Sequence, residues 1–167
     1  LAEAEDRVLA QARAFGEEAA RPAALADFDI LATLDAAELA RLEGYLAPAR
    51  YPAGTVIIAE GEAADRLFLL ASGTAQARVT LADGRPKVLA SFAPGVAFGE
   101  LALFQDERRT ADVVATSEAS CFTLTLDALA RLAAEAPELH GKLLLGVGRG
   151  LAERLRRANA EIRALGR

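Results

Sequence analysis

The chain has 167 residues and a formal net charge of −5, which fits one ordinary domain and argues against non-specific nucleic-acid binding, a task that needs a basic surface. A single Cys excludes an intrachain disulfide, and one Cys with one His argues against a metal cluster or a nucleophilic catalytic site. No apolar run reaches the roughly 18 residues of a membrane-spanning helix, so we expect a cytoplasmic protein without direct membrane insertion.

The N-terminal segment has the composition of a helix. It is rich in Ala and Glu, and Val8, Ala12 and Phe15 recur at helical spacing. The chain has no Met, even at position 1, and no signal-peptide pattern. We therefore expect residues 1–27 to be a helical linker or the tail of a preceding domain, and the chain to be a piece of a longer protein.

A second helix is predicted over residues 36–46. Asp35 is a good N-cap residue, and Glu38 stands three positions later, as a capping box requires. Leu42 and Leu46 then mark one apolar face of this helix.

From about residue 50 to residue 126 the pattern changes to short apolar runs separated by turn residues. Asp83-Gly84 between two of these runs is a hairpin signal. The runs predicted to be strands are Thr55–Ile58, Leu67–Leu70, Ala75–Leu81, Val88–Phe92, Asp112–Ala115 and Cys121–Leu126. Regularly spaced short strands of this kind predict an antiparallel sandwich or a barrel-like roll.

Two helices are predicted after the strands, over about 127–165. Asp127 can cap a short helix through Ala134, and Pro137 fits the first turn of the next helix. That last helix has a long apolar stripe, made of Leu139, Leu143, Val147, Leu151 and Leu155. A stripe of this length needs a partner, which is the strand domain, a second copy of the chain, or both.

Glycines and arginines also mark the last helix. Gly146, Gly148 and Gly150 interrupt it, and each costs about 1 kcal/mol relative to Ala in a helix interior. They predict either a close backbone approach or a bendable point. The helix also carries Arg149, Arg154, Arg156 and Arg157. We expect these to form a solvated face; the alternative is that one of them caps a bound base.

The stretch that carries chemistry lies between residues 98 and 113. Gly99 permits tight backbone, and a short helix is predicted to begin near Glu100. Free N–H groups at a helix start favour an anion, and the Arg109 guanidinium is a planar fork suited to phosphate oxygens. The Glu100 carboxylate beside it could hold a ribose hydroxyl. The alternative is that Glu100 and Arg109 form only a surface ion pair.

This stretch resembles the phosphate-binding cassette of the cyclic nucleotide-binding domain family. That cassette reads apolar-Gly-Glu-x-small-apolar, a short spacer, then Arg-Ser/Thr-Ala-x-apolar, and every element is present from Phe98 to Val113. A second signature of the family lies upstream, in Ile57-Ile58, Gly61, Asp65, the apolar run 67–70 and Gly73. The resemblance covers about residues 28–165.

The resemblance implies an α+β fold of the catabolite-activator type. Its centre would be an antiparallel, jelly-roll-like β-roll of about eight strands, over about 50–126. N-terminal helices, a short internal cassette helix, and C-terminal hinge and lid helices over about 127–165 would complete the domain. The implied ligand is cAMP or cGMP, with no metal.

The resemblance also implies a role for each cassette residue. Arg109 would pair with the cyclic phosphate, and Glu100 would accept a hydrogen bond from the ribose 2′-hydroxyl. Close backbone and N–H groups would come from Gly99, Leu101 and Ala102.

Four further residues would complete this implied site. Thr110 and Ala111 would close the phosphate cradle, and Leu89 and Phe98 would form apolar walls, for which ordinary core packing is the alternative. Thr110 leaves the choice between cAMP and cGMP open. The chain departs from the family in its spacer, which has two acids instead of a Gly-x-Pro turn, and in Asp112, where an uncharged residue is common.

These features predict a regulatory module that senses a cyclic nucleotide and passes a movement of its last helix to an attached effector. The effector could be a glutaminase, or a transporter-like protein that would place the module at the cytoplasmic face of a membrane. A homodimer through the last helix is also expected. The main alternative is a degenerate module that keeps the fold, binds no nucleotide and serves in dimerisation or docking. A transcription regulator needs a helix-turn-helix segment after the lid helix, and enzymatic activity is not expected of this domain.

Overall fold

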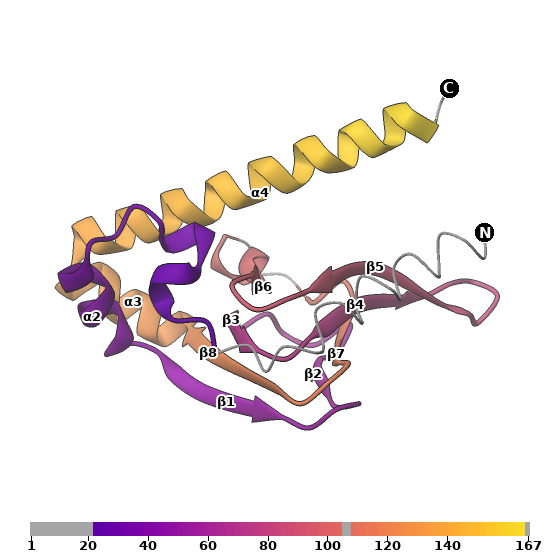
Figure 1. Cartoon of the computed structure of the whole chain (residues 1–167), viewed down its shortest axis with the longest axis horizontal. Helices are drawn as coiled ribbons and strands as arrows, with labels where there is room; N and C mark the ends of the chain where they lie inside the picture. The colour runs from indigo at the N-terminus through magenta and orange to yellow at the C-terminus, as the bar shows by residue number, and fades with distance from the viewer. Residues whose placement is uncertain (1–21, 105–107, 166–167) are drawn as a thin grey trace.

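A computed structural model describes residues 22–104 and 108–165 of the chain. The helix predicted over the first 20 residues lies outside this part, as do the two acids of the spacer. The described residues form a two-sheet β-roll with helices at one end, and a long C-terminal helix runs along one side of the molecule (Figure 1).

Short helices precede the roll. Two 3-10 helices, η1 (Leu25–Asp27) and η2 (Asp29–Leu31), lead to the helix α2 (Ala36–Glu43). The capping box is confirmed, because the Asp35 carboxylate accepts from the Glu38 N–H at 2.8 Å and the Glu38 carboxylate accepts from the Asp35 N–H at 2.9 Å. The predicted end at residue 46 is wrong, since the chain turns after α2 to enter a strand at Ala47.

In the described part of the chain, eight strands form two antiparallel four-stranded sheets. One sheet has the order β1-β8-β3-β6 and the other the order β2-β7-β4-β5. The strands are β1 (Ala47–Tyr51), β2 (Val56–Ile58), β3 (Arg66–Ser72), β4 (Ala75–Thr80), β5 (Pro86–Phe92), β6 (Ala97–Phe98), β7 (Asp112–Ala115) and β8 (Ala119–Thr125). The predicted β-roll is therefore confirmed. The sequence did not reveal β1 and β6: β1 contains Pro48, which an edge strand tolerates, and β6 has only two residues.

Strand β3 separates two hydrophobic clusters and so fixes the inside of the roll. Its side chains alternate between the two faces, as strand geometry requires. Leu67 and Leu69 pack with the helices, whereas Phe68 and Leu70 pack inside the roll with residues such as Phe98. The strand is therefore buried on both faces, and its inner face forms part of the support for the site.

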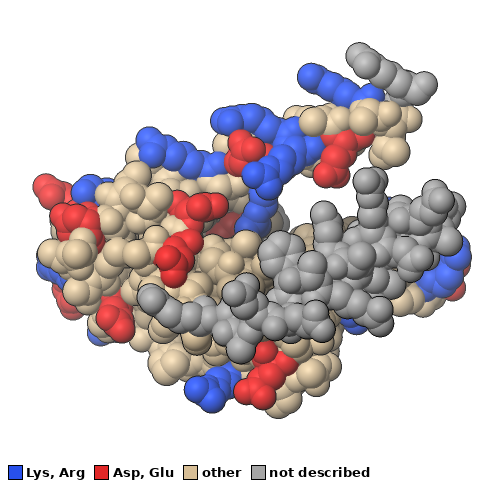
Figure 2. Space-filling view, viewed as in Figure 1, with Lys and Arg blue, Asp and Glu red and all other residues tan. Residues whose placement is uncertain are grey.

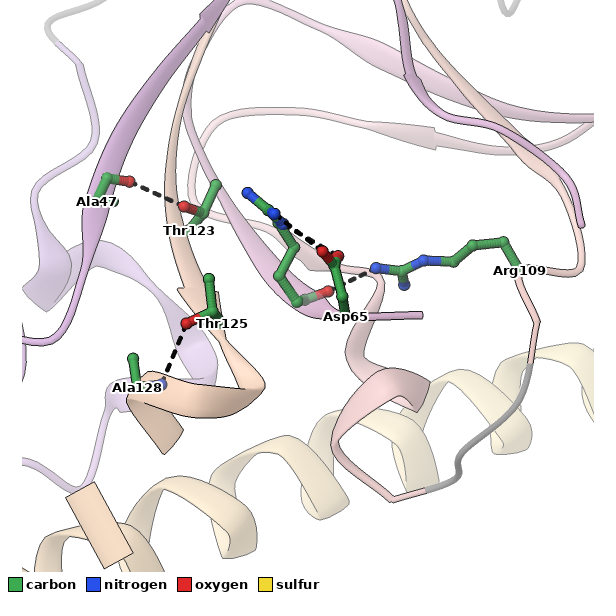
Figure 3. A network of polar contacts seen from close by, with 7 residues as sticks. Ala47, Asp65, Arg109, Thr123, Thr125 and Ala128 are labelled. Atoms are coloured by element: carbon green, nitrogen blue, oxygen red, sulfur yellow. Dashed lines mark hydrogen bonds and ion pairs between the residues drawn. The ribbon is translucent and has the colours of Figure 1, made fainter. Parts of the chain in front are cut away.

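Two helices follow the roll, α3 (Leu126–Glu135) and α4 (Pro137–Leu165). The predicted start of α4 at Pro137 is confirmed. The cap of α3 is Thr125, not Asp127, because β8 runs on to Thr125 and the hydroxyl of this residue accepts from the Ala128 N–H at 3.1 Å (Figure 3).

Helix α4 is anchored at its first half and exposed at its second. Leu139, Leu143 and Val147 are buried in the core, whereas every described residue from 152 onward is exposed. A Cβ at Gly146 would lie 1.9 Å from the backbone oxygen of Ile30, so the predicted close approach is confirmed there. A Cβ at Gly148 would meet nothing within 4 Å, so packing does not explain this glycine.

Candidate functional site

A cavity of about 170 Å³ opens where the roll, the 3-10 helix η3 (Glu100–Leu103) and α4 meet. The start of η3 confirms the helix predicted near Glu100. Seven of the nine residues proposed for the site line this cavity: Phe98, Gly99, Glu100, Leu101, Arg109, Thr110 and Ala111. The structure therefore brings together two segments of the chain that the spacer separates.

Aromatic rings form the apolar side of the cavity. Phe98 stacks on Phe68 with ring centroids 5.0 Å apart and on Phe92 at the same distance. Phe98 is 1% exposed, so it is at once a core residue and a wall of the cavity. Phe92 lines the cavity too, although its only signal in the sequence was its place in a predicted strand.

The Arg109 guanidinium is held by the backbone. Its Nη1 donates to the Gly99 oxygen at 3.0 Å. Its Nη2 donates to the Arg66 oxygen at 2.7 Å, the dashed line from Arg109 in Figure 3. Burial is the largest influence on the Arg109 pKa and lowers it, while the charge of Asp65 raises it. Both hydrogen-bond acceptors are neutral carbonyls, and Arg remains charged in proteins. The cavity therefore contains an oriented positive charge suited to an anion.

The backbone around Arg109 is fixed as well. The Arg109 N–H donates to the Glu62 oxygen at 2.8 Å, and the Arg109 oxygen accepts from the Gly61 N–H at 2.8 Å. Arg108 joins this contact, because its Nη1 donates to the Gly61 oxygen at 2.8 Å. The second family signature therefore has a structural purpose here, since its Gly61 turn orients the cassette arginine.

Glu100 also lines the cavity and is paired with α4. Its side chain is 10% exposed, and its Oε1 accepts from Nη1 of Arg154. Nη2 of the same Arg154 donates to the Ala97 oxygen. The solvated face predicted for the arginines of α4 is therefore wrong for Arg154, which lines the cavity, whereas Arg156 and Arg157 pair with Glu153 on the helix surface. Figure 2 shows Lys and Arg side chains along α4.

Two residues proposed for the site lie outside the cavity lining. Leu89 is 55% exposed on the edge strand β5, where every residue from 86 to 91 is exposed, and a β-bulge leaves it without a partner between the pairs Ala90–Ala77 and Val88–Arg78. Leu89 therefore does not line this cavity, and its role as an apolar wall stays a prediction. Ala102 is buried in η3, where its N–H donates to the Gly99 oxygen at 3.3 Å.

Asp112, the acid that departs from the family pattern, has a structural partner. Its Oδ1 accepts from the Glu60 N–H at 2.7 Å, and it does not line the cavity. Apart from Arg108, the remaining lining residues that sequence analysis did not assign to the site are apolar or small, namely Ile58, Ala64, Ala77 and Val113. They come from strands β2, β4 and β7 and from the loop before β3, so only the fold brings them together.

This fold and cavity define a β-roll ligand-binding domain, and comparison with known proteins identifies its family. Residues 48–136, more than half of the chain, match the family described as Cyclic nucleotide-binding domain. The chain therefore belongs to the cyclic nucleotide-binding domain family, whose members include regulatory proteins. Within the described ranges, no helix is long and apolar enough to cross a membrane, and no cluster of three His, Cys, Asp or Glu could hold a metal.

Known relatives carry such a region within longer proteins. The chain is 35% identical over 135 residues to the CRP-like cAMP-activated global transcriptional regulator of Mycobacterium tuberculosis. The match covers 81% of this chain and 58% of the regulator. It is 37% identical over 138 residues to Glutaminase 1 of Bradyrhizobium diazoefficiens, covering 83% of this chain and 22% of that protein. The structure of the Thermus thermophilus catabolite activator protein is similar, with a TM-score of 0.72 and 28% identity. The match covers 83% of this chain and 63% of that chain.

Proposed function

We propose that this domain senses a 3′,5′-cyclic purine nucleotide, cAMP or cGMP, and passes a movement of α4 to an attached effector. The observation that carries the proposal is the Arg109 guanidinium, a full charge that lines the cavity and bonds only to neutral carbonyls among the described residues. The family of the chain supports the same ligand class.

Each residue of the cavity has a role in this proposal. Arg109 pairs with the cyclic phosphate, whose single negative charge it complements, and Thr110 and Ala111 lie beside it. Glu100 accepts from the ribose 2′-hydroxyl. Gly99 and Leu101 let the backbone approach the sugar phosphate closely, and the buried Ala102 supports η3 from behind.

A thermal melt with and without ligand tests this function. A ligand at 100 times its dissociation constant adds about 2.7 kcal/mol to the free energy of unfolding. We expect cAMP or cGMP to raise the melting temperature and 5′-AMP, which has a dianionic phosphate and no ring closure, to raise it much less. If neither cyclic nucleotide stabilises the protein at millimolar concentration, the domain is the degenerate docking module.

The effector is proposed from the relatives. The Mycobacterium protein is named as a transcriptional regulator and the Bradyrhizobium protein as a glutaminase, and the matched region is only part of each. We infer that this chain likewise regulates a larger cytoplasmic protein, with a glutaminase or a transporter-like protein as candidate effectors, and that it performs no catalysis itself. The full-length gene tests this inference directly.

We also propose that a second copy covers the exposed half of α4. Leu143 and Val147, expected in that contact, are buried in their own domain instead. The exposed apolar residues are farther along: Leu155, Ile162 and Leu165 are 63%, 67% and 88% exposed. With residues 151 and 158, these positions repeat at spacings of three and four, as in a coiled coil.

A further inference from the structure

The part of α4 after Gly150 is called here the distal arm (residues 151–165). Leu151, at its start, packs on the hydrophobic core, and Arg154 makes polar contacts with the roll. The anchored half of α4 is held by buried Leu139, Leu143 and Val147. In the arm, the described ion pairs of Arg156 and Arg157 end on Glu153 of the same helix and so hold it to nothing else. Among the described residues, the polar contact that holds the arm to the roll is therefore the pair of bonds from Arg154 to Glu100 and Ala97.

The helix is weakest directly before this arm. Gly146, Gly148 and Gly150 stand within five residues, and Gly weakens a helix relative to Ala. Gly146 is required by its contact with Ile30, and a Cβ at Gly150 would lie 3.3 Å from the Ile30 side chain. A Cβ at Gly148 would have open space around it, so packing does not require a glycine there. What Gly148 contributes to the helix is backbone freedom. The arm thus joins the anchored half through a bendable segment.

Arg154 also limits the size of the cavity. It lines the 170 Å³ cavity on one side and, on the other, a cavity of about 410 Å³ bounded by η2, residues 95–97 and α4. Small-molecule sites are usually about 300–1,000 Å³. Withdrawal of the Arg154 side chain would enlarge the smaller cavity toward the larger one, and it would free the Oε1 atom of Glu100.

We propose that Arg154 is an internal competitor for Glu100, which holds the distal arm against the roll until a ligand hydroxyl replaces it. This inference rests on the proposed function for the identity of the ligand, but the latch itself belongs to the ligand-free domain. A ligand shifts such an equilibrium only by its different affinity for the two states. The ligand binds the released state more tightly, because in that state both Glu100 and the cavity volume are available.

The competitor lowers the apparent affinity of the site. Only the fraction of molecules in which Arg154 has released Glu100 is competent to bind the ligand. The apparent affinity is the intrinsic affinity multiplied by that fraction. Arg154 is 44% exposed on its side chain, so its ion pair is a modest one. Partly exposed pairs correspond to about a two- to fivefold change in an equilibrium. The Arg154–Glu100 pair therefore lowers the ligand affinity of the site moderately and does not block binding.

Hydrogen exchange of the ligand-free domain tests the latch without any nucleotide. Arg154→Gln keeps a polar side chain but shortens it and removes the charge, and Arg156→Gln is the matched control, two positions away on the same arm. At a concentration where all forms have the same oligomeric state, we expect exchange over 151–165 to be about two- to fivefold faster in Arg154→Gln only. Equal exchange in Arg154→Gln and the wild type, or an equal rise in both variants, overturns the latch.

Calorimetric titration then tests the competition. We expect Arg154→Gln to bind the cyclic nucleotide about two- to fivefold more tightly than the wild type, and Arg156→Gln to bind it equally. Weaker binding by Arg154→Gln would show that Arg154 holds the ligand, which overturns the competition. If the wild type binds no nucleotide, the proposed function fails, while the exchange measurement still decides whether the latch exists.

Discussion

Gly99 and Arg109 fit each other so closely that a Cβ at position 99 would lie 2.9 Å from Nη1 of the arginine. Gly99 also has a φ of 73°, in the left-handed region that favours glycine. The same residue accepts a hydrogen bond from Nη1 through its own carbonyl oxygen. The glycine of the cassette is therefore needed both for its backbone conformation and for the position of the charged group.

Comparison of Gly99→Ala with a matched control distinguishes the effect on backbone conformation from the effect on the position of Arg109. Gly84 has a φ of 81° and open space around a Cβ, so Gly84→Ala introduces the backbone strain alone. We expect both variants to lose about 1 kcal/mol or more of unfolding free energy. Only Gly99→Ala should also lose nucleotide affinity, because its methyl group displaces Arg109. Denaturant unfolding and calorimetric titration measure the two effects, and equal affinity in the two variants would contradict the close fit.

Three of the four charged residues that line the cavity should differ in their effect on binding. Arg109→Ala removes a charge-assisted fork, so we expect about a ten- to hundredfold loss of affinity or more. Glu100→Ala should cost less, because the ribose hydroxyl is neutral and because the change also releases Arg154. Arg108→Ala should cost least, since its guanidinium bonds to the Gly61 oxygen. Titration of the three variants tests the order, and a smaller loss for Arg109→Ala than for Arg108→Ala would refute it.

The cassette itself was predictable from the sequence because its information is local. The order and spacing of Gly99, Glu100 and Arg109 were sufficient to place a helix start, a carboxylate and a guanidinium at one cavity. The β-roll was predictable for a similar reason, since turn residues separate its strands at regular intervals.

What was missed depends on contacts that are remote in sequence. Arg154 lies 54 residues from Glu100 in the sequence. Its contact with Glu100 could be recognised only once the path of α4 in the structure was known. One signal was present: Arg154 follows the buried Val147 by seven residues, which places both on one helix face. Leu89 lies outside the cavity lining because it is on β5, an edge strand exposed from residue 86 to residue 91, and this place in the sheet cannot be read from an apolar run.

Gly148→Ala should stiffen the segment that joins the two halves of α4. Gly141→Ala is its control, because a Cβ at either position meets nothing within 4 Å and both glycines lie in the same helix. Each change should stabilise the helix by about 1 kcal/mol. We expect only Gly148→Ala to slow amide exchange over 146–152, measured by mass spectrometry. If Gly141→Ala slows exchange there equally, Gly148 is not a local hinge.

Cys121 should be inert while the domain is folded. Burial raises the pKa of its thiol to about 12, so the reactive thiolate is scarce at pH 8. We expect alkylation by iodoacetamide to follow global unfolding. Because the folded pKa lies above the unfolded value, the neutral thiol stabilises the fold fully below about pH 8.5, and this contribution is lost as pH rises toward 12. Cys121→Ala should show less loss between these pH values; rapid alkylation of the native protein would contradict the burial.

The exposed half of α4 should form the contact with a second copy of the chain. Leu155 is 63% exposed, and a charge at this position would face a charge on the partner helix across a coiled-coil contact. We therefore expect Leu155→Glu to dissociate the dimer without lowering the unfolding free energy of the monomer. Leu89→Glu is the matched control, because Leu89 is 55% exposed but lies on β5. Sedimentation equilibrium should give a dimer for the wild type and Leu89→Glu and a monomer for Leu155→Glu. A wild type that stays monomeric at high concentration would remove the second copy from the proposal, and a dimer that survives Leu155→Glu would place the contact elsewhere.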